Sequence, residues 1–255
     1  MRKLVSVALL LCCIATARGD WKTLSSQSEP GAAKSLEHRY IVVEESERGD
    51  RASLEVALFS TKWLKLRVLD QATGPRGELA EFMQRDKYLA GVNGGYFTPD
   101  YEPIGLLIVD QRTIAPLQRA RLLTGVLTAS ARGVQLLRVR EFSAAAKWEA
   151  AIECGPFLVD AGKRVSGLED SRAARRTFAA VARDDRVALG FCSDVTLADL
   201  SKILTAPLAS DLQIVRALNL DGGSSSAFWF KRRDGGAFSI AEEKPVRDFV
   251  GVVAR

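Results

Sequence analysis

Short apolar runs with the patterning of β-strands follow one another along most of this 255-residue chain. Two stretches instead have helical spacing: GELAEFMQRD (77–86) and the segment from Leu197 to Leu204, for which Thr196 is a suitable N-cap. Because the helices do not alternate regularly with the strands, the pattern predicts a single α+β domain with mixed, largely antiparallel β-sheets flanked by a few helices. The runs that we expect to be strands are 39–45, 53–60, 62–70, 88–92, 104–110, 122–130, 134–140, 214–220 and 249–254, with a hairpin over 156–165.

The first residues resemble an export signal. Arg2 and Lys3 precede an apolar run over 4–14 and a small-residue cleavage pattern over 15–17, so we expect a signal peptide over 1–17. The run is shorter than the roughly 20 residues that span a bilayer. We therefore expect an exported protein, periplasmic or extracellular, without a stable membrane anchor. Residues 18–36 are polar and predict a flexible leader, with the folded domain over 37–255.

Charge and cysteine content exclude several classes of function. The net charge of +5 falls to +3 without Arg2 and Lys3, and no basic run contains interleaved aromatic residues, so nucleic-acid binding is not expected. Without the signal peptide, Cys154 and Cys192 remain. We expect them to lie near each other, either as buried thiols or as a disulfide. The cysteines and the single histidine give no metal-site spacing, and we expect neither a metal nor a cofactor. The oligomeric state stays open.

The only two asparagines of the chain stand where an apolar run meets a Gly-Gly pair. Asn93 begins NGGYF (93–97), and Asn219 lies two residues before Asp221 in NLDGGSSS (219–226). Paired glycines permit tight turns and close approach of a ligand to backbone amides, which can form an anion-binding nest. Such runs are also common in turns without function. The repeated pattern favours a binding site that contains both turns.

The familiar serine, P-loop and histidine patterns are not matched, which leaves carboxylates as the candidate catalytic groups. Gly-x-Ser-x-Gly is not matched around Ser224, no lysine follows the glycines as in a P-loop, and the only histidine, His38, lies at the start of the domain. Glycoside hydrolysis commonly uses two carboxylates without histidine. Asp221 is the first candidate, and its possible partners are Glu153, Asp194 and Glu102. The arginines at 172, 175 and 176 form either a solvated surface or an anion site.

Several blocks in the same order resemble the phosphodiester glycosidase family, which includes the N-acetylglucosamine-1-phosphodiester alpha-N-acetylglucosaminidase (uncovering-enzyme) domain. They lie between Tyr88 and the C-terminus. The blocks are VNGGYF (92–97), PIGLLI (103–108), CGPFLVDAGK (154–163), ARRT (174–177), TLADLSKIL (196–204) and ALNLDGGSSS (217–226). The chain departs from the family pattern at Phe178, which we expect to reshape the pocket wall.

The resemblance implies an exported bacterial hydrolase that cleaves a sugar 1-phosphodiester in an envelope or extracellular glycan. The alternative is a non-catalytic binding module for an anionic glycan. It also implies catalytic roles for Asp221, Arg176, which would neutralise the phosphodiester, and Asn93. The implied substrate-binding residues, whose amides or side chains would hold phosphate or sugar hydroxyls, are Gly94, Gly95, Tyr96, Gly155, Thr177, Asn219, Gly222, Gly223, Ser224 and Ser225.

Overall fold

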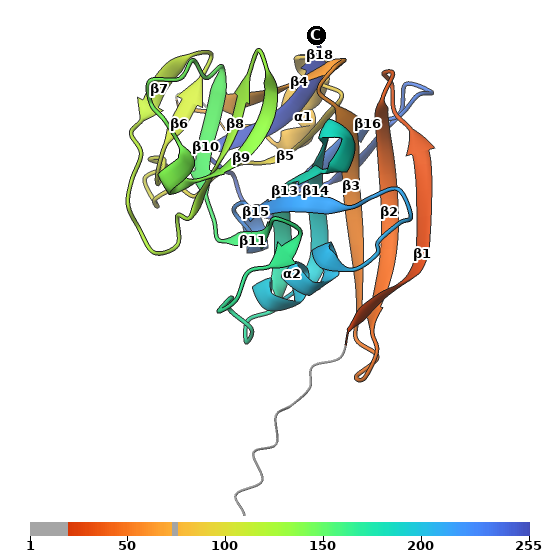
Figure 1. Ribbon diagram of the computed structural model, residues 1–255. Helices are drawn as coiled ribbons and strands as arrows, with labels where there is room; N and C mark the ends of the chain where they lie inside the picture. The colour runs from red at the N-terminus through yellow and green to blue at the C-terminus, as the bar shows by residue number, and fades with distance from the viewer. Residues whose placement is uncertain (1–19, 73–75) are drawn as a thin grey trace, which may run out of the picture.

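A computed structural model of the protein describes residues 20–72 and 76–255. The expected signal peptide, 1–17, lies outside these residues. The described chain folds into one α+β domain of three sheets and two α-helices, as the strand-rich pattern predicts (Figure 1). Every pairing between its named strands is antiparallel. Within the described residues, no helix combines the length and the apolar character needed to cross a membrane.

The largest sheet has eight strands in the order β1-β2-β3-β14-β13-β15-β11-β12. Its first three strands form the tall ribbon at the right of Figure 1, and helix α2 (Leu197–Thr205) covers one face. The strands are β1 (Trp21–Pro30), β2 (Leu36–Glu45), β3 (Arg51–Ser60), β11 (Phe157–Asp160), β12 (Lys163–Arg164), β13 (Ala174–Ala182), β14 (Arg186–Val195) and β15 (Ile214–Asn219).

Two five-stranded sheets complete the domain, in the orders β7-β6-β10-β8-β9 and β17-β16-β5-β18-β4. The first consists of β6 (Leu107–Val109), β7 (Arg112–Ala115), β8 (Gly125–Ser130), β9 (Gly133–Arg138) and β10 (Ala150–Cys154). The second consists of β4 (Leu64–Asp70), β5 (Ala90–Asn93), β16 (Phe228–Lys231), β17 (Ala237–Ile240) and β18 (Asp248–Ala254), with α1 (Leu79–Arg85) against β5. Short 3₁₀ turns lie at η1 (Val139–Glu141), η2 (Arg183–Asp185) and η3 (Gly223–Ser225).

Two apolar cores lie on the two faces of the eight-stranded sheet. Successive residues of a strand point to opposite faces, and β13 follows this rule: Ala179 belongs to the core shared with the smaller sheets, whereas Phe178 and Ala180 belong to the core beneath α2. The ring of Phe178 is fully buried and fills the space above Gly190, where a Cβ atom would overlap it. The expectation that Phe178 forms a pocket wall is therefore wrong, because its side chain packs beneath α2.

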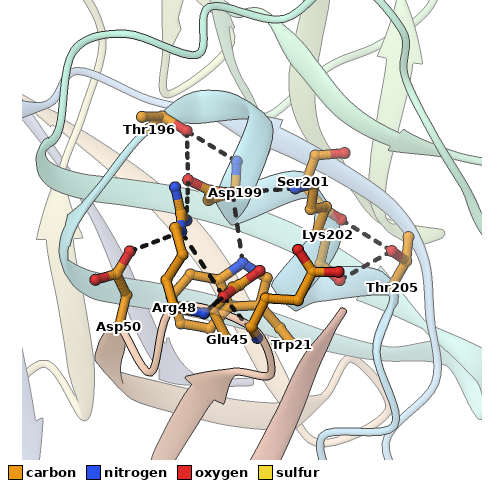
Figure 2. Close-up of polar contacts among 10 residues, drawn as sticks. Trp21, Glu45, Arg48, Asp50, Thr196, Asp199, Ser201, Lys202 and Thr205 are labelled. Atoms are coloured by element: carbon orange, nitrogen blue, oxygen red, sulfur yellow. Dashed lines mark hydrogen bonds and ion pairs between the residues drawn. The ribbon is translucent and has the colours of Figure 1, made fainter. Parts of the chain in front are cut away.

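The expectation of a flexible leader over 18–36 is also wrong, because residues 21–30 form β1. This strand pairs with β2 along its whole length, from Trp21 opposite Glu45 to Pro30 opposite Glu37. Figure 2 shows Trp21 beside the start of α2, where its indole Nε1 donates to Asp199 Oδ1 over 3.5 Å. The polar sequence misleads because β1 is an edge strand whose side chains are mostly exposed, so backbone hydrogen bonds hold it.

Cys154 and Cys192 are free and buried, and they belong to different cores. Cys154 lies in the core shared by the three sheets, and Cys192 lies in the core beneath α2. Burial raises the pKa of both thiols, which makes them poor nucleophiles. The open question of a disulfide is thus answered by two separate thiols.

Candidate active site

Strands β5 and β15 bring two turns together that are far apart in sequence. We call them the NGGYF turn (93–97) and the DGGSSS turn (221–226). Asn93 is fully buried and its side chain makes three hydrogen bonds. Nδ2 donates to the carbonyl of Asp221 over 2.7 Å, and Oδ1 accepts from Thr177 Oγ1 over 2.7 Å and from Ala227 N–H over 3.0 Å. Asn93 therefore fixes the DGGSSS turn with three of its four hydrogen-bonding positions, both acceptor sites of Oδ1 and one N–H of Nδ2.

A carboxylate that sequence reasoning missed lies beneath the NGGYF turn. The backbone carbonyl of Asp248 accepts from Gly94 N–H over 2.9 Å, and its Oδ1 accepts from Gly95 N–H over 2.8 Å. A Cβ atom on Gly94 would overlap this Oδ1, so glycine is required there. Gly94 in turn accepts from Asp221 N–H over 3.0 Å. The amides of Gly94 and Gly95 are therefore occupied by Asp248, contrary to the expectation that they hold phosphate or a sugar.

Burial changes the charge state of Asp248. Its side chain is almost completely buried, and this raises its pKa from 3.8 to about 7, against the opposing effect of the Gly95 hydrogen bond. The nearby negative charges of Asp70 and Asp221 raise the pKa further, and Arg247 lowers it. Asp248 carries no sequence motif. A charged residue at the start of an otherwise apolar final strand was the only available signal.

Asp221 is the carboxylate that reaches the surface of the site. Its residue is half-buried, and burial raises its pKa. Oδ1 accepts from Gly222 N–H over 2.9 Å. The Ser225 hydroxyl lies close enough to favour the charged form, although its geometry falls short of a full hydrogen bond. The positive charge of Lys244 also lowers the pKa. Asp221 is thus fixed at a site edge with its carboxylate still accessible.

The first half of the DGGSSS turn is partly exposed, whereas Ser225 and Ser226 are buried. Gly222, Gly223 and Ser224 are half-buried, and a Cβ atom on Gly223 would meet no atom within 4 Å. Gly223 has a φ of +64°, a left-handed conformation that favours glycine. Its amide and that of Ser224 donate to no residue in the described ranges. This turn, rather than the NGGYF turn, offers free backbone donors.

Asn219, Tyr96 and Gly155 form a supporting network. Asn219 Nδ2 lies 3.0 Å from the Gly155 carbonyl, 2.6 Å from the Leu220 carbonyl and 3.1 Å from the Tyr96 hydroxyl. That hydroxyl donates to the Gly155 carbonyl over 2.5 Å, and burial raises the pKa of Tyr96. A Cβ atom on Gly155 would overlap the carbonyl of Leu122. These residues position the two turns.

Arg176 lies behind the DGGSSS turn. Its Nε donates to the Val195 carbonyl over 2.9 Å, its Nη2 donates to the Arg172 carbonyl over 2.6 Å, and Glu169 lies 3.7 Å away. Its Cδ would be 3.9 Å from a Cβ atom on Gly222. Burial lowers the pKa of the guanidinium. Two of its five N–H donors therefore hold the backbone and Nη2 also faces Glu169, so the guanidinium is only partly available to a phosphodiester.

The carboxylates expected as partners of Asp221 lie elsewhere. Glu102 and Asp194 are exposed. Glu153 is buried and its Oε2 accepts from the backbone amides of Leu106 and Gln118, over 2.8 and 2.9 Å. The carboxylate electrostatically coupled to Asp221 is instead Asp248. Across residues 20–72 and 76–255, no group of three histidine, cysteine, aspartate or glutamate side chains is arranged to hold a metal ion.

The family model described as phosphodiester glycosidase matches residues 86–253 of this chain. The chain belongs to the phosphodiester glycosidase family. The match contains both turns, Asp248 and the network around Asn219, whereas β1 to β4 precede it. No curated protein matches the sequence.

The solved structures that share the fold of this family member include the following three. A hypothetical protein from Synechocystis has a TM-score of 0.67 and 15% identity, covering 91% of this chain and 64% of that protein. The catalytic domain of zebrafish N-acetylglucosamine-1-phosphodiester alpha-N-acetylglucosaminidase, auto-inhibited by its pro-peptide, has a TM-score of 0.67 and 14% identity, covering 92% and 89%. A Burkholderia pseudomallei protein that is described as exported has a TM-score of 0.54 and 13% identity, covering 80% and 74%.

Proposed function

We propose that this protein is a hydrolase that cleaves the glycosidic bond of a sugar 1-phosphodiester in an envelope or extracellular glycan. Membership of the phosphodiester glycosidase family supports the reaction class. The zebrafish relative is, by its name, an N-acetylglucosamine-1-phosphodiester alpha-N-acetylglucosaminidase. The export signal expected over 1–17 and the exported description of the Burkholderia relative support the location.

The observation that carries this proposal is the position of Asp221. It is a half-buried carboxylate with a raised pKa, held on a rigid turn that the buried Asn93 ties to the NGGYF turn. A base is most effective when its pKa is moved towards the working pH. Asp221 accepts a proton from water as the water oxygen bonds to the anomeric carbon, and the bond from that carbon to the phosphate oxygen breaks. The products are the free sugar and a phosphomonoester, which leaves with the bonding electron pair.

The carboxyl group of Asp248 and the side-chain amide of Asn93 position the two turns without contacting the substrate. Asp248 holds the NGGYF turn through both Gly94 and Gly95, and Asn93 holds the backbone of Asp221. Because phosphate is a good leaving group, the reaction needs less help from a general acid than hydrolysis of an ordinary glycoside. One accessible carboxylate is therefore sufficient for the chemistry proposed.

The test is Asp221→Asn, measured with a panel of sugar 1-phosphodiesters by release of free sugar. Asparagine keeps the shape and the hydrogen bond from Gly222, but it cannot accept the proton. General acid–base catalysis contributes about 10²–10⁴-fold, so turnover should fall at least 10²-fold while substrate affinity persists. Asp194→Asn is the matched control, because this carboxylate is exposed and should be dispensable. Wild-type turnover in Asp221→Asn would make Asp221 structural.

The alternative of a binding module for an anionic glycan rests on a different observation. The free amides of Gly223 and Ser224 can hold an anionic oxygen whether or not Asp221 acts as a base. Binding of a sugar 1-phosphodiester by the parent protein without release of sugar would favour this alternative. Release of sugar that depends on Asp221 would exclude it.

A further inference from the structure

Arg175, Arg176 and Arg247, three arginines near the two turns, are already engaged. Arg175 lies 2.9 Å from Glu243 Oε1 and donates to the carbonyls of Ala241 and Ser226. Arg176 donates to two backbone carbonyls, as described above, and Arg247 pairs with Asp70 and donates to another carbonyl. A phosphodiester carries a negative charge that must be matched at the site. None of these arginines has a whole guanidinium free for it.

Two exposed cations near the turn, Arg172 and Lys244, have side chains that make no hydrogen bond or ion pair with the residues that the structure describes. Of these two, Lys244 is the one that lies against the NGGYF turn and acts on the charge of Asp221. Its backbone is nevertheless fixed beside the DGGSSS turn, because the neighbouring Glu243 N–H donates to the Ser224 carbonyl over 2.8 Å. Arg175 adds further bonds between this loop and the turn. A free ammonium group is thus carried on a loop of defined position.

The Lys244 side chain extends towards the NGGYF turn. Its Nζ lies 5.9 Å from the ring centroid of Phe97, within the range of a cation–π contact. Phe97 stacks on Tyr101 with ring centroids 5.3 Å apart and an angle of 8° between the planes. The ammonium group therefore lies where the two turns meet, and its charge reaches the Asp221 carboxylate. At 5.9 Å the contact with Phe97 is loose enough to leave its N–H donors available.

We infer that Lys244 binds the non-bridging phosphate oxygens of the substrate and so selects an anionic phosphodiester over a neutral glycoside. This inference rests on the proposed function and moves the phosphate-binding role from Arg176 to a residue outside every motif. A compact ammonium on a flexible stem binds phosphate as a point charge, without the fixed fork of arginine. The role is recognition of the ground state and of the departing phosphomonoester, in which the negative charge increases.

The test is Lys244→Met, which keeps the length of the side chain and removes the charge. With a sugar 1-phosphodiester, KM should rise about tenfold or more, as expected for loss of a hydrogen bond to a charged group. KM for a neutral aryl glycoside of the same sugar should stay unchanged, and raising the salt concentration should weaken phosphodiester binding by the parent more than by Lys244→Met. Lys244→Arg should restore much of the loss. Lys163→Met, in the exposed β12, is the matched control.

Two outcomes distinguish this inference from the proposed function. If the parent cleaves the phosphodiester and Lys244→Met has the same KM, the inference is overturned and the proposed function stands. If the parent cleaves nothing, binding of inorganic phosphate is measured by titration calorimetry. Binding that is lost in Lys244→Met then supports the inference while the proposed function falls, and equal binding or none overturns it.

Discussion

Replacing Asp248 by asparagine should stabilise the protein at pH 8.5 and leave its stability nearly unchanged at pH 4. In the folded protein the pKa of this carboxyl is raised from 3.8 to about 7, chiefly by burial. Between these values the unfolded chain loses a proton that the folded chain keeps, so the free energy of unfolding falls as pH rises. Above about pH 7 the Asp248 carboxyl is ionised in both the folded and the unfolded state, and the loss in free energy of unfolding stays constant.

The size of the effect follows from the same two values. The difference between 3.8 and about 7, at roughly 1.4 kcal/mol for each pKa unit, amounts to about 4 kcal/mol. Asparagine has no charge to bury, and its oxygen can still accept from Gly95 N–H, so it should recover up to this amount at pH 8.5. Asp248→Ala removes the same charge but also removes the acceptor, and should be less stable than the native chain at pH 4.

The assay is urea unfolding of the three proteins at pH 4 and pH 8.5, compared at equal slope. Groups that titrate between these values without interacting with Asp248 cancel in the difference, and loss of the Asp248 charge also relieves its repulsion with Asp221 and Asp70, which acts in the same direction at pH 8.5. Because Asp248 positions the NGGYF turn rather than touching substrate, Asp248→Asn should also keep most of its turnover, unlike Asp221→Asn. A free energy of unfolding for Asp248→Asn below that of the native chain at pH 8.5 would refute the reasoning.

Three further predictions concern the same framework. Gly94→Ala should unfold at a lower urea concentration than the native chain and lose activity, because the added methyl group overlaps Asp248 Oδ1; a native-like midpoint would contradict this. His38 has both ring nitrogens within 2.8 Å of carboxylate oxygens, and its pKa is raised by these bonds although burial opposes them. The contribution of His38 to the free energy of unfolding should therefore be complete below pH 6.5 and should decline as pH rises through its raised folded-state pKa. In the same unfolding assay, His38→Gln should lower the free energy of unfolding more at pH 5.5 than at pH 9. Thiol titration of the unfolded, non-reduced chain should find both Cys154 and Cys192 reactive, and titration of the folded chain should find neither.

The meeting of the two turns could be predicted from sequence because both contain paired glycines beside a rare asparagine. Glycine at such a position needs a local reason, and here the reasons are the overlap that a larger residue at Gly94 would make and the left-handed conformation of Gly223. What the sequence could not provide was the partner of each amide. Asp248 accepts from the N–H groups of Gly94 and Gly95, and it lies in no recognisable sequence motif.

The strands β13 and β14, at the centre of the large sheet, were not among those predicted, and neither was the edge strand β1. β13 (ARRTFAAVA) is rich in alanine and arginine, and apolar cores cover both faces of the sheet at this strand. Alanine has a weak preference for strands, so this segment forms a strand because of its tertiary packing and not because of its local sequence. Because β13 was not predicted as a strand, Phe178 could not be assigned to one face of the sheet from the sequence.

The long sequence separations in the site have a consequence for how the chain is made. Asn93 and Asp221 are 128 residues apart, and Gly95 and Asp248 are 153 apart. Contacts between distant residues form late in folding, because long loops must close first. During synthesis β5 is complete long before its neighbours β16 and β18 exist, so both of its edges stay open to pairing with other strands. The candidate site is therefore complete only when β18 joins the sheet and Asp248 reaches the NGGYF turn.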